Sequence, residues 1–487
     1  KDEWGRSWPL ALESFGDYKL PGYVWITIGS LSLFGLNDWA VRLPSALAGT
    51  GLVILAYFWA KNFHTSKLKA WFFALVIAVS PVFFFYSRMA FEANLALSLW
   101  VLVLLLLFKN HSRWPQKWLD LTAIGLALFA IFTYNTPLIL LPFVLVALPL
   151  WRGLKNWQQW LLPMLGLTVV FVIGLLQLLP LVSQKGGITI FSDELTTLNY
   201  YAYRTQFTGL ARTVIGNRYL YYLPLIIKNY LASFSPRFLV TNGGAHPWHT
   251  QPDFGHLTWL IYGLGLLGLF TSLVKLFKVV KKQQQGQLQL TNQFRDNLLM
   301  IYLLIISLVP AAITVDAPHA TRSLLFFFMF SFFAIKGLAT LKMVLTAGFL
   351  PLKNLKPDLI IMTLAMLIIL AEASNYFYHY FVDYPNNQAT LKPGFDQVIR
   401  QVAQQYPQDQ LAIVDGSGYQ YILLAWYLKI PAQQYLTSNQ RLQPDKIGFS
   451  YGERVGRFHF IAQSSDKGDQ EKVVLEWSGR KWLVKTF

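Results

Sequence analysis

Long apolar runs without a single charge recur along this chain. Ala70–Tyr86, Trp160–Ser183 and Asn297–Val315 contain no Asp, Glu, Lys or Arg. A helix needs about 20 mainly apolar residues to cross the hydrocarbon core of a bilayer, and these runs approach or reach that length. Only 13% of the residues are charged, against roughly 25% in soluble domains. The sequence therefore indicates a multi-span membrane protein and excludes a soluble enzyme or a disordered chain.

The apolar pattern predicts a mainly α fold, a polytopic transmembrane helical bundle of about ten spans. The predicted spans are 43–60, 70–87, 92–108, 118–134, 136–151, 159–183, 256–274, 297–315, 320–341 and 358–381. The shorter apolar stretch Tyr23–Phe34 predicts a helix lying in the membrane interface.

Lys and Arg concentrate in alternate short loops, which fixes the expected orientation because cytoplasmic loops are rich in these residues. These cations are Lys61, Lys67, Lys69, Lys109, Arg113, Lys117, Arg152, Lys155, Lys275, Lys278, Lys281, Lys282, Arg295, Lys336, Lys342, Lys353 and Lys356. The other short connections carry only Arg88 and Arg322. We therefore expect a multi-pass protein of the cytoplasmic (inner) membrane, with no nucleic acid behind the net charge of +17.

Five segments follow from this topology. They are a first extracytoplasmic loop with its interfacial helix (1–42), spans (43–183), a long extracytoplasmic loop (184–255), spans (256–382) and a small extracytoplasmic α/β domain (383–487). Because the chain opens in an external polar segment, we expect a further span before Lys1.

The two extracytoplasmic segments show their own patterns. Leu195–Leu239 has helical apolar spacing and many tyrosines, and the chain then becomes rich in Gly, Pro and His. In the C-terminal segment, 411–414 reads as a strand, 419–428 as a helix, and 472–477 with 481–486 as a hairpin. The Asp-Gly-Ser-Gly turn at 415–418 fits a plain strand-to-helix turn better than an anion cradle.

Several kinds of chemistry are excluded by missing residues. The chain has no cysteine, which rules out disulfides, thiolate metal sites and a Cys nucleophile. It contains neither a Gly-Lys dipeptide nor an HExxH motif, so a Walker-A loop and a zinc-protease helix are absent. No cofactor is expected, although a divalent metal is not excluded.

The first external segment carries an adjacent carboxylate pair, Asp2 and Glu3. Such a pair is either a solvated turn or, beside the membrane rim, a general base for an acceptor hydroxyl. Lys19 precedes Pro21 and the interfacial helix, where its ammonium is placed to meet a lipid phosphate.

Other polar residues cluster at predicted outer helix ends. Arg42 is either a snorkelling anchor or a substrate contact, and Arg88 with Glu92 is either a helix-stabilising i,i+4 pair or part of a site. Asp316, His319 and Arg322 lie within seven residues, and together they favour a function.

His246 and His249 are too few for a metal centre, since three protein ligands are the usual catalytic minimum. Phosphate binding or packing within the loop is favoured for both. Glu372, near the outer end of the last span, has no explanation in the sequence. All these groups fall on one predicted face, which indicates a single outward-facing site.

Short motifs resemble the GT-C membrane glycosyltransferases, in particular the group of protein O-mannosyltransferases and bacterial aminoarabinose (lipid A) transferases, glycosyltransferase family 39 and relatives. The motifs are Asp2-Glu3, Lys19-Leu20-Pro21-Gly22-Tyr23, Phe34-Gly35-Leu36-Asn37, Val41-Arg42-Leu43-Pro44-Ser45-Ala46-Leu47, Ser80-Pro81 with Tyr86-Ser87-Arg88, and His319 with Arg322. The likeness runs from residue 1 to about 340.

The resemblance implies an inverting transferase that uses a polyprenyl-phosphate-linked sugar. By motif position, Asp2 matches the catalytic acidic residue, Glu3 the second member of the pair, and Lys19 the lysine for the lipid phosphate. Arg88, His319 and Arg322 are further donor-phosphate candidates.

Several features of the reaction stay open. Arg42, Glu92, His246 and His249 are candidate substrate-binding residues. The sugar stays open because Leu-Pro follows Lys19 where the aminoarabinose enzymes have a double proline, and the acceptor is a protein, a lipid or a glycan. The alternative function is a lipid or solute transporter (a flippase) without glycosyl transfer.

Overall fold

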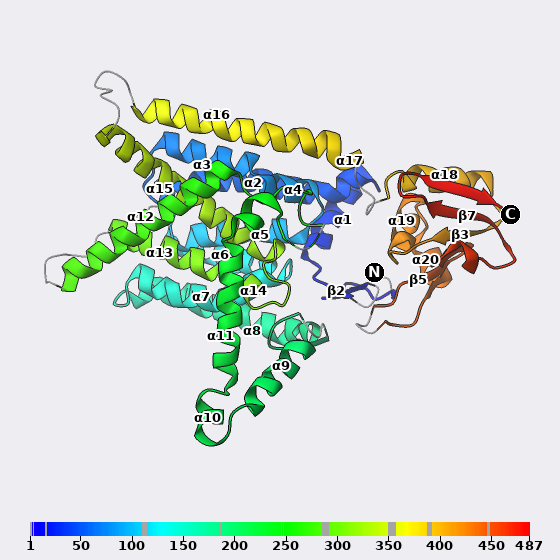
Figure 1. The fold of residues 1–487 in the computed structure, drawn as a ribbon, viewed down its shortest axis with the longest axis horizontal. Coiled ribbons are helices and arrows are strands. Elements are labelled where there is room, and N and C mark those ends of the chain that lie inside the picture. The colour runs from blue at the N-terminus through cyan, green and yellow to red at the C-terminus, as the bar shows by residue number, and fades with distance from the viewer. Residues whose placement is uncertain are drawn as a thin grey trace. The chain divides into compact units, whose positions relative to one another are not determined.

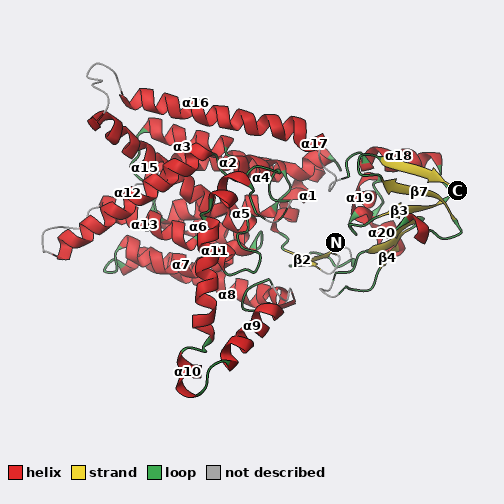
Figure 2. Ribbon diagram, viewed as in Figure 1, coloured by secondary structure: helices red, strands yellow, loops and turns green. Residues whose placement is uncertain are grey.

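The computed structural model describes Asp2 and residues 4–14, 17–109, 114–184, 188–244, 246, 248–284, 292–348, 357–386, 392–445 and 449–487. The chain divides into two compact units, Gly22–Phe377 and Lys1–Pro21 together with Tyr378–Phe487. The first unit is helical, and the described strands all belong to the second (Figures 1 and 2).

A helix or a pair of helices lies at each apolar run from which a span was predicted. The core helices of the helical unit are α1 (Gly22–Phe34), α2 (Asp38–Asn62), α3 (Lys67–Val79), α4 (Pro81–Arg88), α5 (Glu92–Leu107), α6 (Gln116–Ile131), α7 (Asn135–Arg152), α8 (Trp157–Gln184), α12 (Trp259–Gln284), α13 (Asn292–Ile306), α14 (Val309–Ala312), the 3-10 turn η2 (Thr321–Ser323), α15 (Leu324–Gly348) and α16 (Pro357–Tyr378). The mainly α prediction is confirmed.

The number of spans is smaller than ten among the described helices. Seven are long and apolar enough to cross a membrane, and an eighth is obtained if α3 and α4 count as one span. These two helices bend by 55° at Ser80-Pro81, because proline has no N–H to donate and its ring clashes with the preceding turn. α5 and α6 have only 16 residues each, about 24 Å against a hydrocarbon core of about 30 Å. α5 is buried along most of its length, as expected of a short helix inside a bundle.

The long loop folds as helices, as its apolar spacing predicts. It forms α9 (Glu194–Thr205), α10 (Gly209–Val214), α11 (Arg218–Ser233) and the π-turn η1 (Arg237–Thr241), and α9–α11 extend away from the other helices in Figure 1. Tyrosine rings hold α9 against α11. The ring centroids of Tyr200 and Tyr203 lie 5.5 and 5.3 Å from the ring centroid of Tyr221. Asn229 anchors α11 to the bundle by donating to the Ala312 carbonyl oxygen at 2.8 Å.

Many cations of the Lys- and Arg-rich set lie within the ends of helices, and Lys336 and Arg152 have surroundings that the sequence did not reveal. Lys336 lies inside α15, which continues to Gly348. Arg152 is nearly buried and forms a two-pronged ion pair with Asp120 of α6, with N–O distances of 2.6 and 2.9 Å. The orientation inferred from the loop charges stays a prediction.

Glu372, unexplained by the sequence, lies at the start of α12. Its carboxylate oxygens accept from the backbone N–H of Leu260 at 3.3 and 3.4 Å. The first N–H groups of a helix have no partner within the helix, and a carboxylate there also meets the positive end of the helix dipole. Glu372 of α16 therefore stabilises the start of α12.

The second unit contains a two-stranded sheet and a six-stranded mixed sheet in the order β4-β5-β6-β3-β7-β8. β3 is parallel to β6 and β7, whereas the other neighbours are antiparallel. Its elements are β1 (Leu12–Ser14), β2 (Asp17–Lys19), η3 (His379–Asp383), α17 (Tyr384–Asn386), α18 (Phe395–Gln405), β3 (Gln410–Val414), α19 (Gln420–Tyr427), α20 (Ala432–Ser438), β4 (Asn439–Arg441), β5 (Gly452–Val455), β6 (Phe458–Ile461), η4 (Ser464–Asp466), β7 (Glu471–Trp477) and β8 (Trp482–Thr486).

The strand, helix and hairpin predicted in this unit are confirmed as β3, α19 and β7–β8. The plain turn before α19 is also supported, because Asp415 accepts from the N–H of Ser417 and of Gln420, both at 2.9 Å. The carboxylate thus occupies the helix start where an anion would bind. Strands β4–β6 and helices α18 and α20 were not predicted.

α12 and α15 approach each other backbone to backbone. A Cβ on Gly268 would lie 1.9 Å from the carbonyl oxygen of Phe333, and a Cβ on Gly337 would lie 1.9 Å from that of Leu264. Small residues allow this close approach of helices in lipid, where packing rather than hydrophobicity holds them together.

Replacing Gly268 or Gly337 by Ala should therefore destabilise the protein by about 1–3 kcal/mol, the usual cost of overpacking. Gly263→Ala on the same helix is the matched control, because nothing lies within 4 Å of a Cβ there. Thermal unfolding in detergent gives the transition temperature of all three variants. Equal transition temperatures for G268A and G263A would show that the close contact does not determine stability.

Candidate functional site

The polar cluster of the helical unit comprises His246, His249, Asp316, His319 and Arg322. The two histidines come from the segment after η1, Asp316 follows α14, and His319 and Arg322 lie at η2, directly before α15. Residues from two distant parts of the sequence thus meet at one end of the bundle, as the sequence predicts.

Asp316 is the centre of this cluster. Arg322 donates to one of its carboxylate oxygens, while His246 Nε2 and His319 Nε2 lie 3.3 and 3.4 Å from the other. Burial alone would raise the pKa of Asp316, but the charge and the hydrogen bond of the Arg322 guanidinium outweigh burial and the pKa is lowered. Asp316 is therefore an ionised carboxylate that holds a guanidinium in place.

A chain of hydroxyl groups orients His319. The Tyr134 hydroxyl lies 2.8 Å from Thr321 Oγ1, which lies 3.0 Å from His319 Nδ1. If Tyr134 donates to Thr321, the Thr321 hydroxyl donates to Nδ1, and the proton of the neutral imidazole lies on Nε2, facing Asp316. Burial lowers the pKa of His319, which favours this neutral form.

His249 lies against aromatic rings from the first part of the bundle. Its ring is stacked on Tyr86, with 6.2 Å between the ring centroids. Its centroid also lies 5.6 Å from that of Phe91 and 4.9 Å from that of His319. Among the described residues, no hydrogen-bond partner reaches the buried His249 Nδ1 or the buried Tyr86 hydroxyl. Buried polar atoms without partners are costly and ask for an explanation such as a ligand.

Glu92 and Arg42 lie on the same side of the bundle. Both charges act on the Tyr23 hydroxyl, whose pKa burial raises to about 12, with Glu92 adding to the rise and Arg42 opposing it. Glu92 also acts on Tyr134, as do Arg322 and Asp316. These couplings connect the predicted substrate-binding residues with the polar cluster.

The i,i+4 helix pair predicted as one interpretation of Arg88 and Glu92 is wrong. Arg88 is the last residue of α4, and Glu92 is the first residue of α5, so the two do not lie on one helix. The Arg88 guanidinium lies over the Phe84 ring at 5.6 Å.

Three candidate metal ligands lie together, whereas the sequence analysis considered only the two histidines His246 and His249. The ligand atoms of His246, Asp316 and His319 all fall within 4.8 Å of one another, and three protein ligands are usual in catalytic zinc sites. Two features oppose a cation here, since Arg322 already neutralises Asp316 and a proton on His319 Nε2 would have to leave. The absence of a cofactor stays a prediction.

Asp2 and Lys19 belong to the other unit, and Glu3 lies outside the described residues. Asp2 is buried and accepts from Arg6 Nε at 2.6 Å and from the N–H groups of Trp4 and Arg6. Burial would raise the pKa of Asp2, but these bonds outweigh it and the pKa is lowered. Arg6 also donates to Glu13 at 2.8 Å. Lys19 ends β2, and a joint role of Asp2, Glu3 and Lys19 with the polar cluster stays a prediction.

Sequence analysis did not identify Tyr86, Phe91, Tyr134 or Thr321 as site residues. Thr321 lies between His319 and Arg322, so its position alone was a usable signal. Tyr86 stood in a motif of the family resemblance, whereas Phe91 and Tyr134 carried no signal, because the chain has 24 tyrosines and 37 phenylalanines.

The histidines predict a pH dependence of stability. Burial lowers the pKa of His249 from 6.5 to about 4, so between these values the unfolded chain binds more protons than the folded protein. The stability that the neutral His249 contributes is complete above pH 6.5 and is lost as the pH falls towards 4, at about 1.4 kcal/mol per pKa unit.

We expect the transition temperature to fall between pH 6.5 and 4, and to fall less in His249→Gln. His64→Gln is the control, because His64 is exposed and lies outside the polar cluster. An unchanged slope in H249Q, measured by thermal unfolding across this pH range, would contradict the assignment.

Comparison with known proteins gives one family match. Residues 19–177 match the family described as dolichyl-phosphate-mannose-protein mannosyltransferase, and no curated protein matches the chain.

Three solved structures of two proteins are similar. ArnT from Cupriavidus metallidurans overlaps in its apo state (16% identity, 86% of this chain, 76% of that chain, TM-score 0.45) and bound to undecaprenyl phosphate (16%, 87%, 77%, 0.43). The Archaeoglobus fulgidus oligosaccharyltransferase in the apo form overlaps at 13% identity over 84% of this chain and 56% of that chain, with a TM-score of 0.42. TM-scores of this size do not establish a common fold, so the family match carries the resemblance. Over residues 19–177 the chain is therefore similar to the dolichyl-phosphate-mannose-protein mannosyltransferases, which confirms the GT-C glycosyltransferase resemblance found in the sequence.

Proposed function

We propose that this protein is an integral-membrane glycosyltransferase that moves a sugar from a polyprenyl-phosphate donor to an acceptor at the outer face of the membrane. The family match supports the class of reaction and, through the dolichyl phosphate in the family's description, the class of donor. The distribution of Lys and Arg supports the outward orientation of the site.

One observation carries the proposal: the segment that matches the family contacts the polar cluster. Tyr86 and Phe91 lie against His249, and Tyr134 is hydrogen-bonded to Thr321 beside Arg322. A cationic group, unpartnered polar atoms and aromatic walls thus adjoin the part of the chain that is similar to a transferase. Such a setting suits a sugar with a phosphate, because sugars stack on aromatic rings and phosphates pair with Arg.

In the proposed reaction, the acceptor hydroxyl attacks the anomeric carbon of the sugar from the side opposite the phosphate. Asp2 takes the hydroxyl proton, the new glycosidic bond forms, and the bond from the anomeric carbon to the phosphate oxygen breaks. The lowered pKa of Asp2 keeps its carboxylate ionised, as a general base must be before the reaction, and also makes it a weak base. The leaving polyprenyl phosphate carries the electron pair, and its charge is stabilised by Lys19, Arg322 and the neighbouring His319 and Arg88.

The remaining predicted residues then have supporting roles. Glu3 assists Asp2, while Arg42, Glu92, His246 and His249 contact the sugar or the acceptor. The acceptor class, whether protein, lipid or glycan, is left open by this proposal. A flippase would move the lipid without releasing free polyprenyl phosphate, and this product therefore separates the two functions.

Asp2→Asn should lower the rate of sugar transfer by about 10²–10⁴, the usual loss when a general base is removed. Release of free polyprenyl phosphate from a polyprenyl-phosphate sugar in membranes measures it. Because Asp2 also pairs with Arg6, Arg6→Gln and Glu13→Gln are the controls: both disturb the same ion-pair group and leave the Asp2 carboxylate. Equal losses in D2N and R6Q would show that Asp2 acts only through local structure.

Arg322→Gln should lower kcat/KM for the donor by about 10–100-fold, because a charge-assisted hydrogen bond of about 1.5–3 kcal/mol is lost. Arg322→Lys should recover part of this loss, since it keeps the charge without the planar donor geometry. Arg212→Gln on the exposed face of α10 is the matched control. If R322Q and R212Q have the same kcat/KM for the donor, the polar cluster does not bind the donor phosphate.

A further inference from the structure

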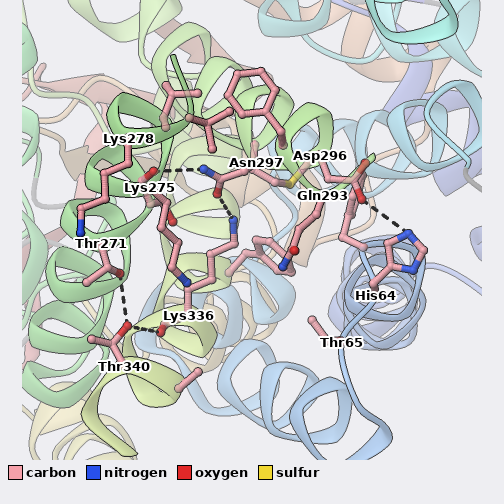
Figure 3. Close-up of a pocket in the computed structure, with 18 of the residues that line it drawn as sticks. His64, Thr65, Thr271, Lys275, Lys278, Gln293, Asp296, Asn297, Lys336 and Thr340 are labelled. Carbon is pink, nitrogen blue, oxygen red and sulfur yellow. Dashed lines mark hydrogen bonds and ion pairs between the residues drawn. The ribbon is translucent and has the colours of Figure 1, made fainter. Parts of the chain in front are cut away.

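A cavity with three lysines in its lining lies at the opposite end of the helical unit from Arg322. It has a volume of about 520 Å³ and is lined by the second half of α12, the start of α13, the second half of α15 and the residues that follow α2 (Figure 3). Neither the predicted site residues nor the proposed reaction uses it. Ligand sites in proteins have volumes of roughly 300–1,000 Å³, so this cavity has room for a small headgroup.

Positive charge dominates the lining. Lys275 and Lys278 come from α12 and Lys336 comes from α15, and in Figure 3 Lys275 and Lys336 extend into the same space. Asp296 is the one carboxylate among the lining residues, and it lies 3.7 Å from His64 at the other side of the cavity. The cavity therefore presents an excess of positive charge to any occupant.

Lys336 is the residue that most needs a counter-charge. It is half-buried, it lies over the rings of Phe332 and Phe333, and its ammonium donates to Asn297 Oδ1 at 2.6 Å. An amide oxygen solvates the ammonium but does not neutralise it, and Asp296, the lining carboxylate that acts on Lys336, is shared with His64. Ionisable side chains within spanning helices are costly and mark functional positions, and an anion in the cavity would compensate this charge.

The surroundings of the cavity indicate an occupant that comes from the membrane. Met343 lines the cavity and is 62% exposed, and Val344, Phe277 and Val280 beside it on α15 and α12 are exposed apolar residues. Such side chains face acyl chains when the helices span a bilayer. The adjacent loops belong to the Lys-rich set that predicts the cytoplasmic side, whose leaflet carries the anionic lipids.

We propose that this cavity binds the phosphate headgroup of an anionic phospholipid, with Lys275, Lys278 and Lys336 around the phosphate and Asn297 holding Lys336 in place. Basic pockets between spanning helices on the cytoplasmic side are a known setting for such headgroups. The assignment does not depend on the proposed transferase reaction, because it concerns the other end of the bundle.

The test measures binding of phosphatidylglycerol to the purified protein in detergent, by native mass spectrometry and by the lipid-dependent shift of the unfolding temperature. Lys275→Gln/Lys278→Gln removes two exposed cations from the lining, so folding should be unaffected. Lys67→Gln/Lys281→Gln is the charge-matched control, because both lysines are exposed and outside the lining. We expect the half-saturating lipid concentration to rise by about 25-fold in K275Q/K278Q, about fivefold for each lysine, and to stay near the wild-type value in K67Q/K281Q.

Lys336→Gln gives the second measurement. It should weaken phosphatidylglycerol binding as well, while zwitterionic phosphatidylcholine should bind weakly to every variant. Equal binding by the wild type and K275Q/K278Q, or an equal loss in the K67Q/K281Q control, would overturn the site. The last experiment adds inorganic phosphate alone. If phosphate gives the full shift of the unfolding temperature and phosphatidylglycerol raises that temperature no further, the cavity is a site for free phosphate and the lipid assignment is wrong.

Discussion

The close contact between α12 and α15 sets the positions of both polar regions of the helical unit. At Gly268 and Gly337 each helix leaves no room for a side chain, because the partner's carbonyl oxygen lies where a Cβ would be. η2, which leads directly into α15, carries Arg322, and α15 itself carries Lys336, about 20 Å further along the axis. A sliding of α15 against α12 would therefore displace the phosphate-binding candidate at one end and the lysine cavity at the other.

The two polar regions balance their cations in different ways. Arg322 has a carboxylate partner in Asp316, and a guanidinium has five N–H donors in a fixed plane. Asp316 therefore orients Arg322 and leaves donors for a substrate that binds, reacts and departs. Lys336 donates to an amide oxygen of Asn297, and Asp296, the carboxylate that acts on it, is shared with His64, which leaves positive charge for an occupant. This difference suits transient binding at the first region and longer residence at the second.

Much of the fold could be predicted from the sequence because hydrophobicity alone places helices in a membrane chain. Where local chemistry interrupts that pattern, the signal was present but was not used: Pro81 marks the bend between α3 and α4. Strands β4–β6 carry a weak signal, since they are only three or four residues long. β6, which joins them to the rest of the sheet, pairs with β3, which lies earlier in the chain. Short strands gain stability from their neighbours, which a local pattern does not contain.

For the site, the sequence identified charged groups well and their partners poorly. Asp316, His319 and Arg322 stood out because ionisable residues at the end of an apolar run are rare and costly. Thr321 and Tyr134 did not, because a hydroxyl becomes informative only when the fold brings another polar atom within 3 Å. The same reason explains Arg152, which reads as a loop cation until Asp120 of another helix is placed beside it. A sequence thus reveals which groups must be compensated, whereas only the packing of helices reveals what compensates them. Lys336, which donates to an amide oxygen rather than to a carboxylate, is the residue for which we propose compensation from outside the chain.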